Sequence, residues 1–593
     1  MSAEYVIGID LGTTNSVVAY APYGEESPSI SLLEIPQVVS AGTIENRLSL
    51  PSFLYLPTQG EKGFELPWDD SPEYVVGDYA RKQSADVPDR TVGAAKSWLA
   101  HHRVDRHQKI LPWNAPADVE KISPVDATSA FLKHLVAAWG HQFPEVTFAE
   151  QKVVLTVPAS FDASARELTR DAAIRAGLPE DFILLEEPQA ALYSWLHQTG
   201  DRWRKLVNVN DAILVVDIGG GTTDLTLVKV SEESGELELK RTAVGNHLLV
   251  GGDNMDLALA HQAATKFGEK GTQLDPWQSV SLWHSCRLAK EKMLAVDGAE
   301  TESISVLGRG KKLIGGSISI ELDRAETQAL LLDGFLPQCQ LDEKPAQRRA
   351  SGFQEIGLPY ESDTSITKHI ADFLSRHSET DEPICPTDVL VNGGVFKAPA
   401  LSDRLMNVLS DWFPNSPPKV LSGERDLDHA VARGAAVYGW TKDHGGVRIR
   451  GGTARSYYVG IETAGLAIPG IARPLNALCV VPKGMEEGTE TDVPSNEIGL
   501  IVGEPAQFRF FSSSSRKEDQ PGTVLSRWEP EELNETDPLE ATLTAENVAD
   551  VYSVPVTFQS KITELGVFEL WCVGATPEQK WKLEFSVRED DDV

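Results

Sequence analysis

The chain has 593 residues, enough for several domains, and 41% of them are apolar, as in globular proteins with sizeable cores. Its formal net charge of −34 argues against nucleic acid or an anionic membrane as the main partner, because phosphate groups are bound by basic surfaces. No apolar run approaches the roughly 20 residues that cross a bilayer, and the N-terminus lacks a signal-peptide pattern. Five widely spaced cysteines without zinc-site spacing favour a reducing compartment, so we expect a cytoplasmic protein.

The first half of the chain alternates apolar strands with amphipathic helices. Asp162 is placed to cap a helix that ends near Gly177. The histidines at 101, 102 and 107 lie in a charged stretch, for which a solvated surface is the expected setting. The strands and helices that the pattern predicts here are strands at 5–20, 51–56, 153–158, 183–187 and 212–230, and helices at 129–139 and 162–177.

The second half continues the alternation and then changes character at Trp440. Predicted helices begin near Met255 and cover 283–294, a strand and helix cover 318–337, and a strand with a glycine turn covers 388–395. The polar stretch 340–367 reads as an insertion. Beyond a linker at 441–456, regularly spaced short β-like runs over 457–588 predict a β-sandwich, and residues 589–593 form an acidic tail. The fold class is therefore α/β with two related lobes over 1–440, followed by a β-rich domain.

Two stretches share one design and organise the first 440 residues. In each, an apolar strand ends on an aspartate, a glycine turn with paired threonines follows, and a second strand returns: Asp10 to Thr14 in the first, Asp217 to Thr223 in the second. Two such copies about 200 residues apart are improbable by chance. Each aspartate can hold the waters of a hard cation, and each glycine turn offers N–H donors to phosphate. Facing each other, the two turns would clamp a triphosphate. Neither matches a Walker loop.

Six ordered motifs together resemble the seventy-kilodalton heat-shock chaperones of the DnaK type. They are residues 9–16, 154–159, 187–191, 217–224, 392–394 and 430–436. The resemblance covers about three quarters of the chain and implies an actin-like, two-lobed ATPase domain with ATP between the lobes. It further implies a β-sandwich-like domain that binds unfolded or client polypeptide, with a J-domain co-chaperone and a nucleotide-exchange factor as possible partners.

The resemblance also assigns roles to individual residues. Lys96, Glu187, Thr222 and Asp217 would be catalytic, with Lys96 orienting the attacking water. Asp10 and Asp217 would bind Mg²⁺ through water. Pro158 and Arg166 resemble a switch pair that passes the nucleotide state to the other domain. Residues expected to contact ATP or ADP are Asp10, Gly12, Thr13, Thr14, Asn15, Gly219, Gly220, Gly221, Thr222, Gly251, Gly252, Lys290, Gly393, Gly394 and Asp428.

Three features depart from the family pattern. The linker carries Arg448, Arg450 and Arg455 in place of an apolar, Leu-rich core, which puts the coupling between ATP and substrate in doubt. Only a few residues follow Val587, so we expect no helical lid over the β-rich domain. The inserted stretch 340–367 is a candidate binding site for a dedicated partner or nucleotide exchanger, but an ordinary surface loop without a function of its own is the expected interpretation of such a segment.

Three functions are compatible with these patterns. The first is an ATP-dependent chaperone with weak intrinsic turnover. The second is a nucleotide-gated scaffold with one dedicated protein partner. The third, less favoured, is a small-molecule kinase of the actin superfamily, which has no need of a β-sandwich after its second lobe. Stimulation of hydrolysis by unfolded peptide, capture of a single protein, or phosphate transfer to a small acceptor would separate them.

Overall fold

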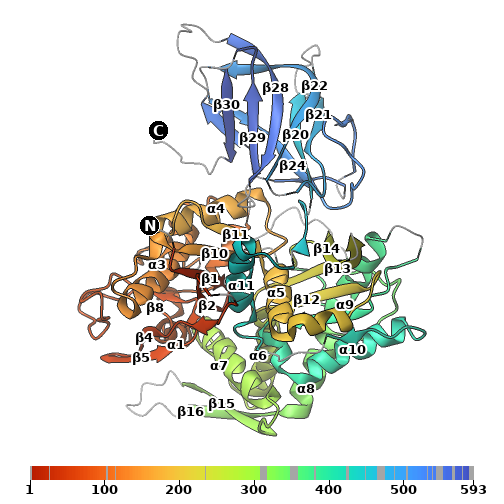
Figure 1. The fold of residues 1–593 in the computed structure, drawn as a ribbon. Helices are drawn as coiled ribbons and strands as arrows, with labels where there is room; N and C mark the ends of the chain where they lie inside the picture. The colour runs from red at the N-terminus through yellow and green to blue at the C-terminus, as the bar shows by residue number, and fades with distance from the viewer. Residues whose placement is uncertain are drawn as a thin grey trace.

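The computed structural model describes residues 3–585 apart from 26, 102–103, 114, 234–235, 308–316, 347–357, 359, 379–381, 422–425, 448, 454, 464–473, 487, 503–504, 530–531, 537–538, 543–551, 564–567 and 577–578. Figure 1 shows a two-lobed α/β body with a β-rich domain at one end. The predicted acidic tail, residues 347–357 and 359 of the predicted insertion, and Arg448 of the predicted linker lie outside the described residues.

The first lobe is built on a mixed sheet in the order β11-β10-β1-β2-β3, with β6 also paired to β2. The middle of β1 is buried throughout, as expected for a strand covered on both faces. Its elements are β1 (Tyr5–Leu11), β2 (Asn15–Pro22), β3 (Ser31–Leu32), β6 (Leu50–Pro51), β10 (Lys152–Val157), β11 (Ile183–Glu186), α3 (Pro124–Gln142) and α4 (Ala163–Arg175). Asp162 caps α4 by accepting from the Ala165 amide at 2.9 Å, as the sequence predicts.

A smaller subdomain extends the first lobe. It consists of a β4-β5 hairpin, a short sheet in the order β8-β7-β9, and two helices. Its elements are β4 (Ile35–Ser40), β5 (Thr43–Arg47), β7 (Leu54–Tyr55), β8 (Val75–Val76), β9 (Thr91–Val92), α1 (Asp78–Asp86) and α2 (Ala95–Leu99).

The second lobe repeats the arrangement of the first. In each lobe a central strand pairs antiparallel with the next strand through the glycine turn and parallel with a later strand: β1 with β2 and β10, then β12 with β13 and β17. The sheet order is β18-β17-β12-β13-β14-β19. Its elements are β12 (Ala212–Ile218), β13 (Thr223–Glu233), β14 (Glu236–Val244), β17 (Asp388–Asn392), β18 (Lys419–Val420), β19 (Ile449–Arg450), α5 (Glu187–Thr199), α9 (Ile366–Arg376), α10 (Pro399–Trp412) and α11 (Ala430–His444).

A second subdomain extends this lobe and packs α6 and α7 around one apolar cluster with a two-stranded sheet. Its elements are α6 (Gly252–Glu269), α7 (Pro276–Leu294), β15 (Thr301–Leu307), β16 (Ser317–Asp323) and α8 (Arg324–Phe335). Short 3₁₀ turns cover Pro88–Arg90, Phe148–Glu150, Gly200–Lys205 and Gly394–Lys397.

Helices α5 and α11 lie between the lobes and are packed at backbone distance (Figure 1). A Cβ built on Gly434 of α11 would lie 1.7 Å from the Ala190 carbonyl oxygen of α5, so only glycine allows this approach. Gly8 of β1 meets the other side of α11 in the same way, with Ala432 and Ala436 as neighbours. The small residues of α11 therefore allow this helix to pack closely against both α5 and strand β1 of the first lobe.

The β-rich domain consists of two sheets, in the orders β25-β21-β20-β24-β26 and β22-β28-β29-β30-β27-β23. Tyr457, Val480 and Phe510 of the first sheet share one apolar cluster with Phe558 and Leu583 of the second. Its elements are β20 (Ser456–Glu462), β21 (Leu475–Val481), β22 (Thr489–Val502), β23 (Pro505–Phe508), β24 (Phe510–Ser513), β25 (Val524–Leu525), β26 (Asn534–Glu535), β27 (Leu539–Thr542), β28 (Tyr552–Ile562), β29 (Phe568–Val573) and β30 (Lys580–Phe585).

The segment that joins the body to the β-rich domain is more ordered than the sequence indicates. Helix α11 continues to His444, past the predicted boundary at Trp440, and β19 then adds to the edge of the second-lobe sheet, parallel to β14. Ile449 of β19 is buried at 7% exposure in a second-lobe cluster, and β20 begins at Ser456. Ile449, with Val447 packed against the same cluster, thus anchors a linker that lacks a Leu-rich core.

No helix in the described part of the chain has the length and apolar character needed to cross a membrane. All five cysteines are free thiols.

Candidate functional site

The two glycine turns meet across a cavity of about 660 Å³ between the lobes. A Cβ built on Gly220 would lie 1.9 Å from the Thr14 hydroxyl of the opposite turn, and one on Gly12 would lie 2.2 Å from the Asn15 carbonyl oxygen. Glycine at these positions therefore lets the two turns approach each other and the cavity closely. This is the arrangement expected of an anion cradle.

Asp10 and Asp217 occupy equivalent positions at the ends of the central strands β1 and β12. The Thr156 hydroxyl donates to Asp10 Oδ1 at 3.4 Å, and the Asn392 amide donates to Asp217 Oδ2 at 2.7 Å. Both carboxylates line the cavity. Parallel strand pairing supplies both partners, because Thr156 lies on β10 and Asn392 ends β17.

Lys96 of α2 is buried at 7% exposure and forms a short ion pair with Glu187 at the start of α5. Lys96 is therefore not an exposed helix lysine. Burial alone would lower the pKa of Lys96, but the charges of Glu187 and Asp10 raise it overall. The ammonium therefore stays charged in the cavity wall.

The carboxylates outnumber this one ammonium, and their ionisation is correspondingly unfavourable. Burial, together with the charge of Glu187, raises the pKa of Asp10 to about 7 and that of Asp217 to about 8. Burial also raises the pKa of Glu187, although Lys96 opposes the shift. A cation bound near Asp10 and Asp217 would remove this penalty.

The donor set suits a hard cation held through water. Among the residues the structure describes, no group of three or more acidic, histidine or cysteine side chains is arranged to hold a metal ion directly. Asp10 and Asp217 still face one cavity from opposite lobes and offer the oxygen ligands that Mg²⁺ prefers, and Mg²⁺ commonly keeps several waters. The residues present thus fit the water-mediated Mg²⁺ site that the sequence predicts.

Asp224 is a cavity residue to which sequence reasoning gave no role. It pairs across the hairpin with Asp217 and lines the cavity beside Lys96 and Glu187. Burial would raise the pKa of Asp224, but the nearby imidazole of His247 and the hydrogen bond from Ser160 lower it overall. The sequence does carry a signal for this residue, since Asp224 closes the second glycine motif.

The far end of the cavity is formed mainly by the second lobe. Lys290 of α7 pairs with Asp256 of α6 at 2.7 Å and donates to the Gly252 carbonyl at 3.1 Å. Asp428 pairs with Lys397 at 2.5 Å, with both side chains about half exposed. Lys290 is therefore fixed on its own lobe, whereas the Asp428 pair lies at the open edge of the cavity.

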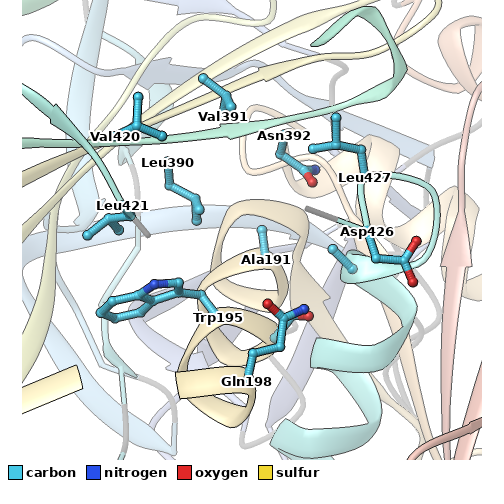
Figure 2. A pocket seen from close by; sticks show the side chains of 12 residues that line it. Ala191, Trp195, Gln198, Leu390, Val391, Asn392, Val420, Leu421, Asp426 and Leu427 are labelled. Carbon is cyan, nitrogen blue, oxygen red and sulfur yellow. The ribbon is translucent and has the colours of Figure 1, made fainter. Parts of the chain in front are cut away.

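A separate, much smaller pocket of about 40 Å³ lies behind this end, between α5, β17 and the start of α11 (Figure 2). Asn392 and Leu427 line both hollows and separate them. Figure 2 shows Trp195 and Gln198 of α5 on the side of the pocket across from Asn392. A small hollow thus lies behind the residue whose amide holds Asp217.

The structure brings together almost all of the residues that the sequence predicts for the site. Gly221 and Gly251 are not among the residues that line the cavity. Gly251 packs behind the second turn, where a Cβ would lie 2.7 Å from the Gly220 carbonyl oxygen. Those that line it are Asp10, Gly12, Thr13, Thr14, Asn15, Lys96, Glu187, Asp217, Gly219, Gly220, Thr222, Gly252, Lys290, Gly393, Gly394 and Asp428.

Arg166, one of the two predicted switch residues, lies outside the cavity. Its guanidinium donates to Glu186 Oε1 at 2.8 Å, and Arg241 of β14 pairs with the other oxygen of the same carboxylate. Glu186 thus joins α4 of the first lobe to β14 of the second, next to the β-rich domain.

The prediction that the histidines at 101, 102 and 107 lie on a solvated surface is wrong for His101. This side chain is 2% exposed and stacks on Trp98, with ring centroids 5.4 Å apart. His107 is partly buried, and its pKa is lowered mainly by burial. The stacking is a tertiary contact that the local charge pattern could not show. Position 102 lies outside the described residues.

A family model described as Hsp70 protein matches residues 66–339. This match, over a little under half of the chain, supports a relationship to the Hsp70 family. Members of this family share the actin-like ATPase fold, bind nucleotide with Mg²⁺, and generally bind client polypeptides and co-chaperones. The matched range contains Lys96, Glu187, the second glycine hairpin and Lys290, whereas Asp10 and Asp428 lie outside it. The first copy of the glycine hairpin, at Asp10 to Thr14, lies before the matched range.

Proposed function

We propose that this protein is an ATP-dependent chaperone of the DnaK type. It binds ATP with Mg²⁺ between the lobes, hydrolyses it to ADP and phosphate with weak intrinsic turnover, and uses the nucleotide state to gate polypeptide binding by its β-rich, sandwich-like domain. The observation that carries the proposal is the cavity of about 660 Å³ in which two glycine turns face each other beside a buried lysine–glutamate pair.

The residues of the cavity divide the work of phosphoryl transfer between them. Thr13, Thr14 and Asn15 and the glycines of the second turn bind the phosphates, and Asp10 and Asp217 hold the waters of Mg²⁺. Bound Mg²⁺ neutralises charge on the triphosphate. Lys96, oriented by Glu187, and the Thr222 hydroxyl stabilise the negative charge that develops on the γ-phosphate and position the attacking water.

Contacts between the body and the β-rich domain support gating. Arg455 donates to the Ser160 carbonyl at 3.4 Å, and Ala163 of α4 packs against the core of the β-rich domain. Strand β19 adds the connecting segment to the second-lobe sheet. The β-rich domain and its linker thus contact both lobes, through α4 of the first and the sheet of the second. A rotation of one lobe against the other would change these contacts, so the nucleotide state could alter the position of the β-rich domain.

ATP hydrolysis by variants of the cavity tests the enzymatic part. We expect Lys96→Ala and Thr222→Ala to lose about 100-fold in hydrolysis rate, since each removes a stabiliser of transition-state charge. Lys133→Ala removes an exposed lysine of α3 and is the matched control, with the rate unchanged. Wild-type rates in both cavity variants would contradict the assignment of the site.

Two other functions give different results with the same preparation. Phosphate transferred from ATP to a small acceptor would indicate a kinase. ATP-dependent capture of one dedicated protein, without stimulation by unfolded peptide, would indicate a nucleotide-gated scaffold. For the chaperone we further propose a J-domain co-chaperone and an exchange factor as partners, and a cytoplasmic location supported by the five free thiols.

A further inference from the structure

Three side chains form a hydrogen-bonded chain that leads from the cavity into the protein. Ser160, between β10 and α4, makes a short hydrogen bond to Asp224 Oδ1, and its Oγ lies 2.7 Å from Nδ1 of His247. Ser160 is 3% exposed and Asp224 4%. Ser160 comes from the first lobe, whereas Asp224 and His247 come from the second.

The chemistry of the three groups sets the direction of the chain. A serine hydroxyl has one proton, and the ionised carboxylate can only accept, so Ser160 donates to Asp224. Ser160 must then accept from His247, which places a proton on Nδ1. Among the described residues, Nε2 of His247 is buried with no hydrogen-bond partner, and the ring packs edge-on against Phe161 at 5.5 Å.

The chain is not a nucleophile triad. In such a triad the imidazole lies between the carboxylate and an accessible hydroxyl. Here the hydroxyl lies between the other two groups and is buried. The chain can orient a carboxylate, but it offers no nucleophile to a substrate.

We infer that Ser160 and His247 are positioning residues for ATP hydrolysis, which hold the Asp224 carboxylate in place beside Lys96 and Glu187. The inference rests on the proposed function. Other charged groups that act on Asp224 or its neighbours are Lys96 of α2, Glu187 of α5 and Asp217 of β12. Without the hydroxyl of Ser160, Asp224 is free to turn toward Lys96 and compete with Glu187 for its ammonium. The water-orienting groups would then be displaced while the phosphate cradle stays intact.

Steady-state kinetics with Mg-ATP, together with the affinity for a fluorescent ADP analogue, test the inference in the full chain. We expect Ser160→Ala and His247→Ala to lower kcat about 10- to 100-fold, because small displacements of orienting groups are costly. The ADP affinity and the KM for ATP should stay within about twofold of wild type. His247→Asn should recover most of kcat, since its amide N–H can replace Nδ1–H. His261→Ala, at an exposed site on α6, is the matched control.

Each outcome is decisive. Unchanged kcat in both alanine variants would overturn the inference while leaving the proposed function standing. The alanine variants could instead lose ADP affinity or unfold at a lower temperature in parallel with the fall in kcat, with no recovery in His247→Asn. That result would show a merely structural role and would also overturn the inference. A wild-type chain that binds ADP without hydrolysing ATP, or that binds neither ADP nor ATP, would contradict the proposed function. The inference would then fail as well.

Discussion

Asp10 and Asp217 are held where their negative charge is unfavourable in the nucleotide-free protein. Burial raises the pKa of Asp10 to about 7 and that of Asp217 to about 8, and the charge of Glu187 adds to the effect. Such a site is unfavourable for stability and favourable for binding a cation, as is common where function and stability compete. At the scale of single residues, the main feature of the site is therefore a pair of buried carboxylates that a bound cation would stabilise.

Replacing one of these carboxylates should stabilise the nucleotide-free protein and abolish hydrolysis. A carboxyl group with a raised folded-state pKa binds its proton more tightly when folded, so its stability contribution is lost as pH rises through about 7 for Asp10. We therefore expect Asp10→Asn to raise the thermal unfolding midpoint by a few degrees at pH 8, and by less at pH 6. Asp70→Asn, at an exposed position, is the control. A lower midpoint at pH 8 would contradict this account.

At the scale of elements, the close packing of α5 against α11 holds the lobes together. Gly434→Ala would drive a Cβ into the Ala190 backbone, which cannot move without shifting a helix. We expect a loss of about 3 kcal/mol in the free energy of unfolding, as for overpacking of a tight interface. The measurement is denaturant unfolding followed by tryptophan fluorescence.

Gly140→Ala in α3 is the matched control for this prediction. A Cβ there meets no atom within 4 Å, so alanine should stabilise the helix by about 0.5–1 kcal/mol. Equal changes in the free energy of unfolding for Gly434→Ala and Gly140→Ala would show that close packing is not the reason for the destabilisation at position 434.

Most elements and most of the cavity residues could be predicted from the sequence because they depend on local patterns. The apolar strands, the glycine turns and the Asp162 cap are set by neighbours in the chain. The grouping of Asp224, Ser160 and His247 could not be predicted from the sequence, because their contacts span 64 and 87 residues. Strand β19 has only two residues, too few for any periodicity, and its anchor Ile449 depends on pairing with β14.

At the scale of the whole molecule, cations gather where the β-rich domain meets the body. Lys517 donates to the His377 carbonyl at the end of α9 at 3.0 Å, which places a positive charge at the negative end of that helix. Burial, with the charges of Lys517 and Arg241, lowers the pKa of Lys483 to about 8. Protonated Lys483 therefore opposes docking of the two parts.

Docking of the β-rich domain should strengthen as the solution becomes alkaline. Lys483 has a lowered pKa when docked and an ordinary one when released, so its docking penalty is present at pH 7 and declines above about pH 8. Energy transfer between dyes on the body and on the β-rich domain should therefore report more docked molecules at pH 9 than at pH 7. Lys483→Met should remove this difference and raise docking at pH 7. A pH dependence unchanged by Lys483→Met would contradict the role of this lysine.

The most direct test of the central claim is the rate of ATP hydrolysis by the full chain with and without an unfolded hydrophobic peptide. If ATP bound between the lobes gates the β-rich domain through β19, the peptide should raise the rate several-fold, and Ile449→Asp should abolish the increase while preserving the basal rate. A basal rate that peptide leaves unchanged in the wild-type chain would contradict the account, because ATP hydrolysis and polypeptide binding would then be uncoupled.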